Sequence, residues 1–296
     1  MFQLHSLNRS DFPSKTFILN SPITKSILFQ PNLAGKELQD LLDESSVMLA
    51  KAIHEVALEQ VKRKQVAEVV LLAGGLFYGL NYGFKKAFNF SINQCFLGVK
   101  RFNEDGGWVA RAAYENFEAL PDNPVVLIGD TIAGGTTIDK AVSSLEKALG
   151  EKNYSLKKLV ICSLACSSKG GQRIASIEKR IKQKWPGCEV FLIACEEFFH
   201  VMPDGTDLRF LREDAVVLEE TRQAVLEAYG PWLGREMKCA VFDWGTRCKQ
   251  PEAHYREFLH YVDGALKQGG DGKAKAVLGK MREKTGAALA GLDTQA

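Results

Sequence analysis

Residues 125–137, VVLIGDTIAGGTT, have the composition needed to hold a phosphate. An apolar run predicts a buried strand that ends just before Asp130, and a loop of small residues follows it. Such a loop lets backbone N–H groups approach an anion closely, and a helix starting at Thr137 adds partial positive charge. We therefore expect a phosphate site formed by Ala133, Gly134, Gly135, Thr136 and Thr137. The alternative is an ordinary strand-to-helix turn with a threonine cap.

Asp130 is the acidic residue at the end of this strand, and its carboxylate can accept hydrogen bonds from ribose hydroxyls. Its alternative role is to cap the following helix. The loop contains neither GK[ST] nor GxGxxG, so the sequence supports neither a Walker A nucleotide site nor a Rossmann dinucleotide site.

Histidine and cysteine do not form metal-binding patterns in this chain. The five histidines lack paired ligand spacing, so we expect no histidine metal site. The seven cysteines lie mostly in apolar runs, which is typical of buried free thiols in a reducing compartment. We therefore expect a cytoplasmic protein.

Short apolar runs alternate with helical patterns through the first two thirds of the chain. The runs are nearly continuous rather than alternating, which suits strands buried on both faces of a parallel sheet. The order predicts a doubly wound, mostly parallel α/β sheet. We expect residues 1–34 to be irregular. Strands are expected at 69–72, 95–99, 125–128, 159–164 and 190–194, and helices at 38–64, 78–87, 137–149 and 171–184.

The C-terminal part of the chain has a different pattern. We expect an α/β domain at 1–212 and a mainly helical extension at 213–296, which packs on it or on a partner subunit and shapes a ligand pocket. The apolar side chains of the extension are too many to remain in water. Its helices are expected at 218–229, 252–266 and 276–290, with a short strand at 239–242.

The overall composition limits the function classes. The 296 residues carry 38 Lys and Arg against 36 Asp and Glu, and 46% of residues are hydrophobic. This balance is that of a globular protein and lacks the charge excess of a dedicated nucleic-acid or membrane-surface binder. We see neither a signal peptide in residues 1–20 nor an apolar run of about 18 residues.

Residues 129–137 resemble the phosphoribosyl-diphosphate signature of type I phosphoribosyltransferases, in which a buried strand and two acidic positions precede an A-T-G-G-T loop. Further segments are similar, in the same order, to the uracil phosphoribosyltransferases of that family. These segments are 22–57, 72–79, 98–101, 114–121 and 201–210, and the likeness covers roughly residues 20–212.

The resemblance implies transfer of a phosphoribosyl group from phosphoribosyl diphosphate to a nucleobase-like or other planar nitrogen acceptor by a homodimer. Mg²⁺ is the implied cofactor, held mainly by substrate phosphates with Asp207 as the protein ligand. The implied catalytic residues are Asp130, Arg101 and Asp207. Arg101 would bind diphosphate together with Ala73, Gly74 and Gly75, and the acceptor would lie against Met202, Pro203, Gly205 and Asp207.

Four positions depart from the family pattern: Gly129 replaces the first acid, Gly134 the loop threonine, Thr136 a loop glycine, and Ala73 an arginine. A lost hydrogen bond to a charged group costs about 1.5–3 kcal/mol, which weakens binding without abolishing it. Two other functions therefore stay open, a non-catalytic ligand-binding or regulatory protein and a ribosyl-phosphate hydrolase or lyase. Arg101 could equally be a surface residue, and Asp207 a turn residue in PDGTD.

Overall fold

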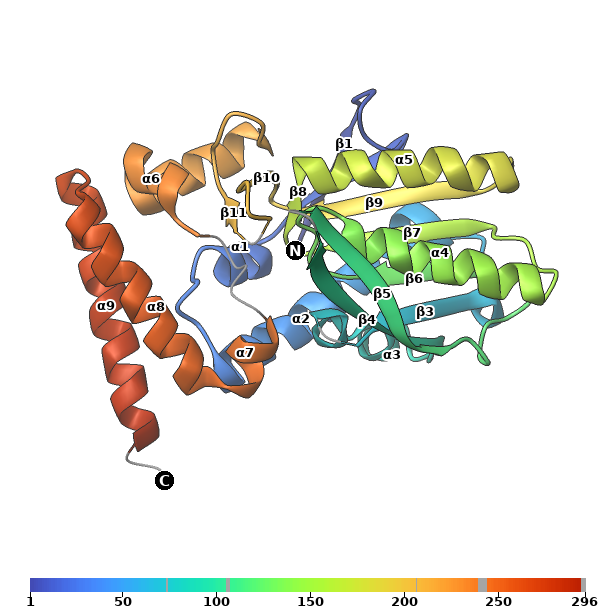
Figure 1. The fold of residues 1–296 in the computed structure, drawn as a ribbon, viewed down its shortest axis with the longest axis horizontal. Coiled ribbons are helices and arrows are strands. Elements are labelled where there is room, and N and C mark those ends of the chain that lie inside the picture. Colours follow the sequence, from blue (N-terminus) through green and yellow to red (C-terminus); the bar gives the residue numbers. More distant parts are fainter. Residues whose placement is uncertain (73, 105–106, 206, 239–243, 294–296) are drawn as a thin grey trace.

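The computed structural model describes residues 1–72, 74–104, 107–205, 207–238 and 244–293. Its main feature is an eight-stranded sheet with the order β1-β2-β9-β7-β6-β3-β4-β5 (Figure 1). The pairs from β2 to β4 are parallel, and β1 and β5 are antiparallel edge strands. The strands are β1 (Gln3–Leu7), β2 (Lys15–Asn20), β3 (Val66–Leu71), β4 (Asn93–Glu104), β5 (Gly107–Asn116), β6 (Val125–Gly129), β7 (Lys158–Ser163) and β9 (Glu189–Cys195).

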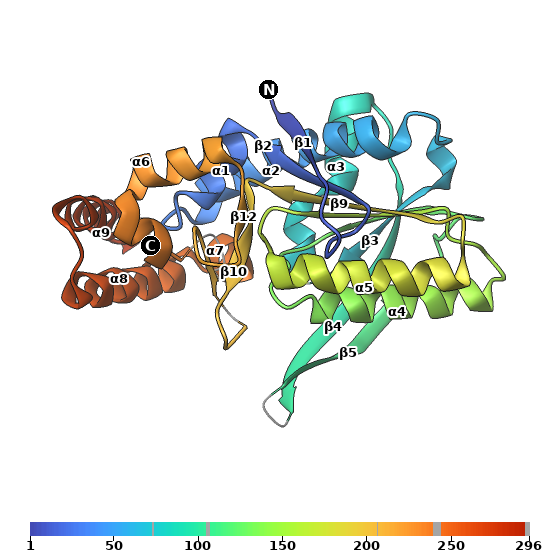
Figure 2. The same cartoon turned by 90° about the horizontal axis from the view of Figure 1, so that it is seen from above.

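Helices cover both faces of the sheet, which confirms the predicted doubly wound α/β fold (Figure 2). One buried cluster joins the sheet to α2 (Gly35–Ile53) and α3 (Leu80–Phe88). The other joins it to α4 (Thr136–Glu151) and α5 (Ser168–Lys184). Strands β3 and β6 are buried along their whole length, as the apolar runs within them predict, and β3 also buries Glu68.

The expectation that residues 1–34 are irregular is wrong. They form β1, β2 and the helix α1 (Pro22–Leu28). The helix start follows a recognisable rule, because the Ser21 side chain accepts from the Thr24 N–H and Pro22 occupies the first turn. Strand β2 is stabilised by parallel pairing with β9, a contact between segments far apart in sequence.

A smaller sheet extends from the carboxyl end of β9. Strand β10 (Glu197–Val201) pairs with β8 (Cys166–Ser167), β11 (Leu208–Arg209) and β12 (Val216–Val217). Glu196, at φ 65°, makes the turn between β9 and β10. This small sheet holds the 202–205 turn beside the end of the main sheet.

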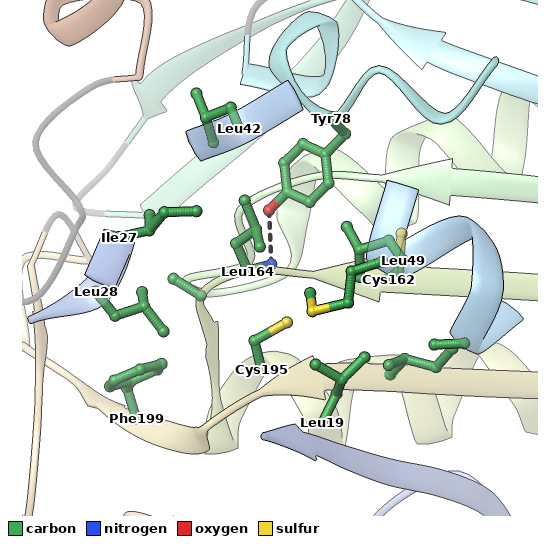
Figure 3. Close-up of a cluster of buried hydrophobic side chains, with 14 of the residues drawn as sticks. Leu19, Ile27, Leu28, Leu42, Leu49, Tyr78, Cys162, Leu164, Cys195 and Phe199 are labelled. Atoms are coloured by element: carbon green, nitrogen blue, oxygen red, sulfur yellow. Dashed lines mark hydrogen bonds between the residues drawn. The ribbon is translucent and has the colours of Figure 1, made fainter. Parts of the chain in front are cut away.

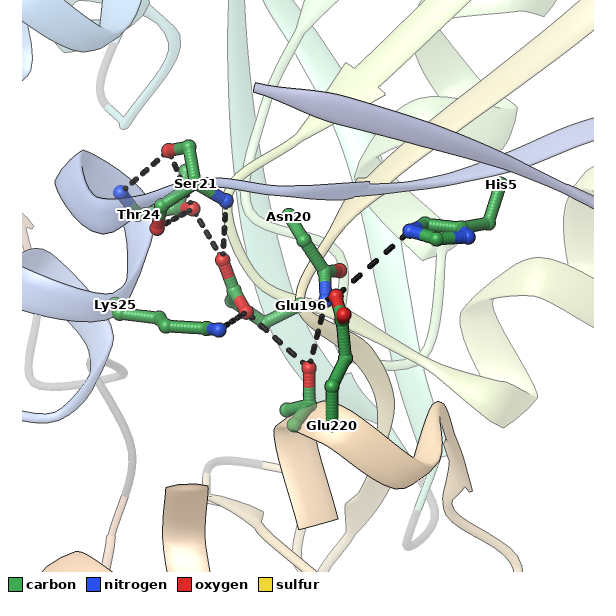
Figure 4. A network of polar contacts seen from close by, with 8 residues as sticks. His5, Asn20, Ser21, Thr24, Lys25, Glu196 and Glu220 are labelled. Atoms are coloured by element: carbon green, nitrogen blue, oxygen red, sulfur yellow. Dashed lines mark hydrogen bonds and ion pairs between the residues drawn. The ribbon is translucent and has the colours of Figure 1, made fainter. Parts of the chain in front are cut away.

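The Glu196 carboxylate is the centre of a buried polar network (Figure 4). It accepts hydrogen bonds from the Ser21 N–H at 2.9 Å, from the Thr24 hydroxyl, and from the Thr221 hydroxyl at 3.3 Å. Lys25 Nζ lies 4.0 Å from it. Because these partners come from the start of α1 and from the helix α6 (Glu219–Glu236), the network joins the sheet to the C-terminal region.

The C-terminal helices lie together at one end of the molecule (Figure 1). They are α6 (Glu219–Glu236), kinked at Gly230 before Pro231, α7 (Trp244–Lys249), α8 (Pro251–Gln268) and α9 (Gly272–Asp293). Their buried side chains continue the α2-side cluster, part of which Figure 3 shows. The strand expected at 239–242 lies outside the described residues.

Two buried side chains of α7 and α8 fasten this region to the loop after α1. The Arg247 guanidinium donates to the carbonyl oxygens of Gln30 and Leu33 at 2.8–3.2 Å, and the His254 ring bonds the Pro31 carbonyl at 2.7 Å. The C-terminal helices therefore share one core with the sheet. Among the described residues, no helix has both the length and the apolar character required to cross a membrane.

Candidate functional site

The loop between β6 and α4 is shaped by Gly135. This residue is the N-cap of α4 at φ +76°, a conformation that favours glycine. A Cβ atom here would also lie 2.8–2.9 Å from the side chain of Arg173. Helix α4 thus begins at Thr136, one residue earlier than predicted, and no threonine side chain caps it.

The first part of the loop is anchored to the chain after β7. The Ile132 N–H donates to the Ala165 carbonyl at 2.9 Å, the Ser167 N–H donates to the Ile132 carbonyl at 2.8 Å, and the Ser167 hydroxyl donates to the Ala133 carbonyl. The N–H groups from Gly134 to Thr137 have no acceptor within the part of the chain that the structure describes. They are the unsatisfied donors of a helix start, which suit an anion.

These residues line a cavity of about 310 Å³ at the carboxyl ends of the strands. The predicted site residues that it brings together are Arg101, Asp130, Ala133, Gly134, Gly135, Thr136, Thr137, Met202, Pro203 and Gly205. Trp108, Lys169 and Arg173 also line it and were not predicted. Segments far apart in sequence therefore meet at the predicted phosphate loop.

Asp130 is a buried carboxyl in the cavity wall, with only 8% of its surface exposed. Burial raises its pKa to about 7, although the Thr131 N–H and the charge of Arg101 act in the opposite direction. Because Gly135 is the N-cap, Asp130 does not cap α4. A buried cavity carboxyl that titrates near neutral pH is typical of a functional group.

Tyr78 explains the glycine at position 129. A Cβ atom at Gly129 would lie 2.8 Å from the Tyr78 ring, so no acidic side chain fits there while this ring is in place. The Tyr78 hydroxyl accepts from the Leu164 N–H at 2.9 Å (Figure 3). The same hydroxyl lies 3.4 Å from Thr131 Oγ1. The missing first acid therefore follows from packing beside the site.

Within the predicted diphosphate segment, the described residue Gly75 does not line the cavity. Gly74 and Gly75 begin a 3₁₀ turn, Gly74–Tyr78, which packs against the end of β6, and a Cβ at Gly75 would lie 2.9 Å from the Gly129 carbonyl oxygen. The described lining of the cavity does not include this turn. Ala73 lies outside the described residues.

The β4–β5 hairpin forms one wall of the cavity through Arg101 and Trp108. The Arg101 guanidinium carbon lies 5.5 Å from the centre of the Trp108 ring. The Trp108 Nε1–H donates to the Asp204 carbonyl at 3.0 Å, and a Cβ at Gly205 would lie 3.2 Å from the same indole. Trp108 thus connects the hairpin to the 202–205 turn and places Arg101 over the cavity.

Asp207 lies outside the cavity lining and is engaged elsewhere. Its carboxylate lies 3.2 Å from Arg209 Nη2 and 3.1 Å from Lys238 Nζ. A carboxylate neutralised by two cations does not fit the predicted Mg²⁺ ligand. No group of three or more His, Cys, Asp or Glu residues suited to a metal occurs within the described ranges.

The C-terminal extension and the cysteines can also be compared with the sequence predictions. Among the described residues, no position after Gly205 lines the cavity, so the described part of the C-terminal extension adds no residue to its lining. Arg247 of the extension is buried in the contact with Leu33. Five of the described cysteines are buried, as expected, and Cys248 is half-buried.

Comparison with known proteins finds solved structures that are similar to this chain at low sequence identity. No protein-family model matches the sequence, and no curated protein matches it. The chain is similar to a mutant of hypoxanthine phosphoribosyltransferase from Trypanosoma cruzi, complexed with the product IMP. The identity is 18% and the TM-score 0.34, over 63% of this chain and 91% of that one.

Two further similar structures have TM-scores of 0.29 and 0.30. Adenine phosphoribosyltransferase from Thermoanaerobacter pseudethanolicus is 12% identical, over 53% of this chain and 80% of that one. A hypothetical protein from Neisseria gonorrhoeae with bound ppGpp is 12% identical, over 42% of this chain and 66% of that one. The resemblance to uracil phosphoribosyltransferases stays a prediction from the sequence.

Gly135 and Gly134 provide a matched pair of variants for the loop. We expect Gly135→Ala to weaken phosphate binding, because alanine strains the backbone at φ +76° and displaces Arg173. Gly134→Ala has open space around its added Cβ, so we expect little change in binding. Isothermal titration with ribose 5-phosphate checks both variants. Equal loss of affinity in the two would show that the loop geometry does not set binding.

Proposed function

We propose that the chain transfers a phosphoribosyl group from phosphoribosyl diphosphate to a planar nitrogen acceptor. The observation that carries this proposal is the cavity that joins the 133–137 loop, Asp130 and Arg101. This transfer needs three groups: backbone donors that hold a phosphate, a carboxylate that binds the ribose, and a cation that neutralises the leaving diphosphate.

Each group has a role that follows from its position. The N–H groups at the start of α4 hold the 5′-phosphate, and Asp130 accepts hydrogen bonds from a ribose hydroxyl. Breaking the anomeric C–O bond generates an oxocarbenium-like transition state, as in glycoside cleavage. Arg101 neutralises the diphosphate that leaves. The acceptor lies against the cavity wall formed by Trp108, Met202 and Pro203.

Mg²⁺ stays part of the proposal as a partner of the substrate phosphates. It characteristically binds phosphate oxygens with one or two carboxylates, and when bound it would neutralise diphosphate charge. Asp207 is not a suitable ligand because Arg209 and Lys238 already occupy its carboxylate. Cytoplasmic location and a homodimer also remain expectations from the sequence.

A second candidate function is binding of a ribosyl phosphate without turnover. It is favoured by one observation, the Tyr78 ring that fills the space where a side chain at position 129 would start, which leaves Asp130 as the carboxyl at the end of β6. A cavity with one acidic side chain fewer than the family pattern can retain affinity for a ribose 5-phosphate group while losing transfer activity.

Mass spectrometry of reaction mixtures separates these functions. The purified protein is incubated with phosphoribosyl diphosphate, with or without Mg²⁺, and a panel of nucleobases and other planar nitrogen acceptors. We expect a new nucleoside monophosphate with one acceptor class, and a smaller yield without Mg²⁺. Tight binding without product favours the ligand-binding function, and breakdown that needs no acceptor favours a hydrolase or lyase.

A further inference from the structure

Lys169 lies where the phosphate loop meets the 202–205 turn. Strand β8 pairs in parallel with β10, with Ser167 opposite Phe199, so the residues that follow Ser167 run beside the end of β10. On the other side, a Cβ atom at Gly170 would lie 2.6 Å from Ile132 and 3.0 Å from the Ala133 carbonyl oxygen. The start of α5 is thus held tightly between the two walls of the cavity.

The positive charge of Lys169 is not neutralised by any residue that the structure describes. No acidic residue occupies the first turn of α5, and no carboxylate in the described ranges lies within 4.0 Å of the Lys169 ammonium. Other cations of this helix do have partners, since Arg173 pairs with Asp139 at 3.3 Å and Lys182 with Glu178 at 2.7 Å.

The helix dipole makes this position unfavourable for a lysine. The first turn of a helix carries partial positive charge, so a cation there is repelled, whereas an anion is stabilised. Lys169 therefore does not contribute to the stability of α5 through its charge. A ligand anion in the cavity would relieve the repulsion and gain from both the ammonium and the helix start.

The neighbouring cavity wall indicates what that ligand is. Met202, Pro203 and Trp108 give it an apolar and aromatic surface, which suits a flat ring. The phosphate loop on the other side already supplies backbone donors for the 5′-phosphate, and Arg101 stands on the hairpin wall. Lys169 is then the cation next to the space left for the acceptor.

We propose that Lys169 binds an anionic substituent of the acceptor, so that the acceptor is a planar nitrogen heterocycle bearing a carboxylate rather than a neutral base. The inference rests on the proposed function and specifies its acceptor class. One charge-assisted hydrogen bond from Lys169 would make an acceptor that bears a carboxylate bind about 10- to 100-fold more tightly than the matching neutral acceptor.

Binding of matched acceptor pairs tests this inference. Isothermal titration compares orotate with uracil and nicotinate with nicotinamide, for the unmodified protein, Lys169→Met and Lys169→Arg. We expect the unmodified protein to prefer the carboxylates, Lys169→Met to remove the preference, and Lys169→Arg to keep part of it. Tighter binding of the neutral members, a preference that survives in Lys169→Met, or no binding of any of the four would overturn the inference.

Two controls distinguish this inference from the proposed function. Lys179→Met removes an exposed lysine from the same helix away from the cavity lining, and we expect it to leave the preference unchanged. Phosphoribosyl diphosphate is titrated into every variant. If it fails to bind to the unmodified protein, the proposed function fails, whereas its binding with no carboxylate preference overturns only the role of Lys169.

Discussion

Asp130→Asn is expected to lower turnover at least about tenfold, and up to about 100-fold, because the amide replaces a charged hydrogen bond to the ribose with a neutral one. At pH 8 the same substitution is expected to stabilise the fold. The carboxyl is buried, and burial raises its pKa to about 7, so ionisation in the native state is unfavourable.

The contribution of Asp130 to stability depends on pH, because its pKa differs between the folded and the unfolded chain. The pKa of Asp130 is about 7 in the folded chain against an ordinary value of 3.8, so the native state binds more protons between these pH values. Stability contributed by the neutral carboxyl is present at low pH and falls as pH rises toward 7, by up to about 4 kcal/mol. Asparagine does not ionise, so the Asp130→Asn variant does not lose stability in this way.

Urea unfolding at pH 4 and pH 8 measures the difference between Asp130→Asn and the unmodified protein. We expect the variant to be the more stable protein at pH 8 and to lose that advantage at pH 4. Equal destabilisation at both pH values would assign Asp130 a structural role and remove it from the ligand site.

Arg247→Met is expected to cost about 3 kcal/mol of unfolding free energy, because it leaves the buried carbonyl group of Leu33 without its two guanidinium donors and removes one donor from the Gln30 carbonyl. The side chain is fully buried and holds α7 against the loop after α1. Urea unfolding gives the magnitude. Arg256→Met is the matched control, since Arg256 is an exposed residue paired with Glu252 and should cost less than about 1 kcal/mol.

If Arg247→Met and Arg256→Met lose the same free energy of unfolding, the contact of Arg247 with the loop after α1 does not stabilise the C-terminal helices. Ribose 5-phosphate binding adds a second readout. The cavity includes no described residue after Gly205, so we expect Arg247→Met to retain ligand affinity wherever it remains folded.

The sequence was most informative where a local pattern sets the structure. The apolar run 125–128 predicts β6 because its side chains are buried on both faces. The small residues after Asp130 predict the loop because a close approach of the backbone requires them. Gly135 shows this directly, since its φ of +76° and its contact with Arg173 leave no room for a side chain.

Features that depend on distant contacts could not be predicted in this way. Strand β2 is defined by pairing with β9, and its own residues carry no clear signal. Trp108 and Lys169 enter the site only when the hairpin and α5 meet the 202–205 turn. Asp207 looked available as a ligand because its partner Lys238 comes from a later segment of the chain.

The role of Gly129 also required the structure. In the sequence alone, Gly129 stands where the family pattern has its first acidic residue, with no visible reason for the change. The structure gives the physical reason, because the Tyr78 ring lies where a side chain would start. The departure therefore reflects packing by the Gly74–Tyr78 turn, and the carboxyl beside it, Asp130, remains in the cavity.

A crystal structure with phosphoribosyl diphosphate bound is the most direct test of the central claim that this cavity holds a ribosyl phosphate. We expect the 5′-phosphate on the N–H groups of Gly135, Thr136 and Thr137, with a ribose hydroxyl on the Asp130 carboxylate. A ligand bound elsewhere, with the 133–137 loop making no contact to phosphate, would contradict the claim.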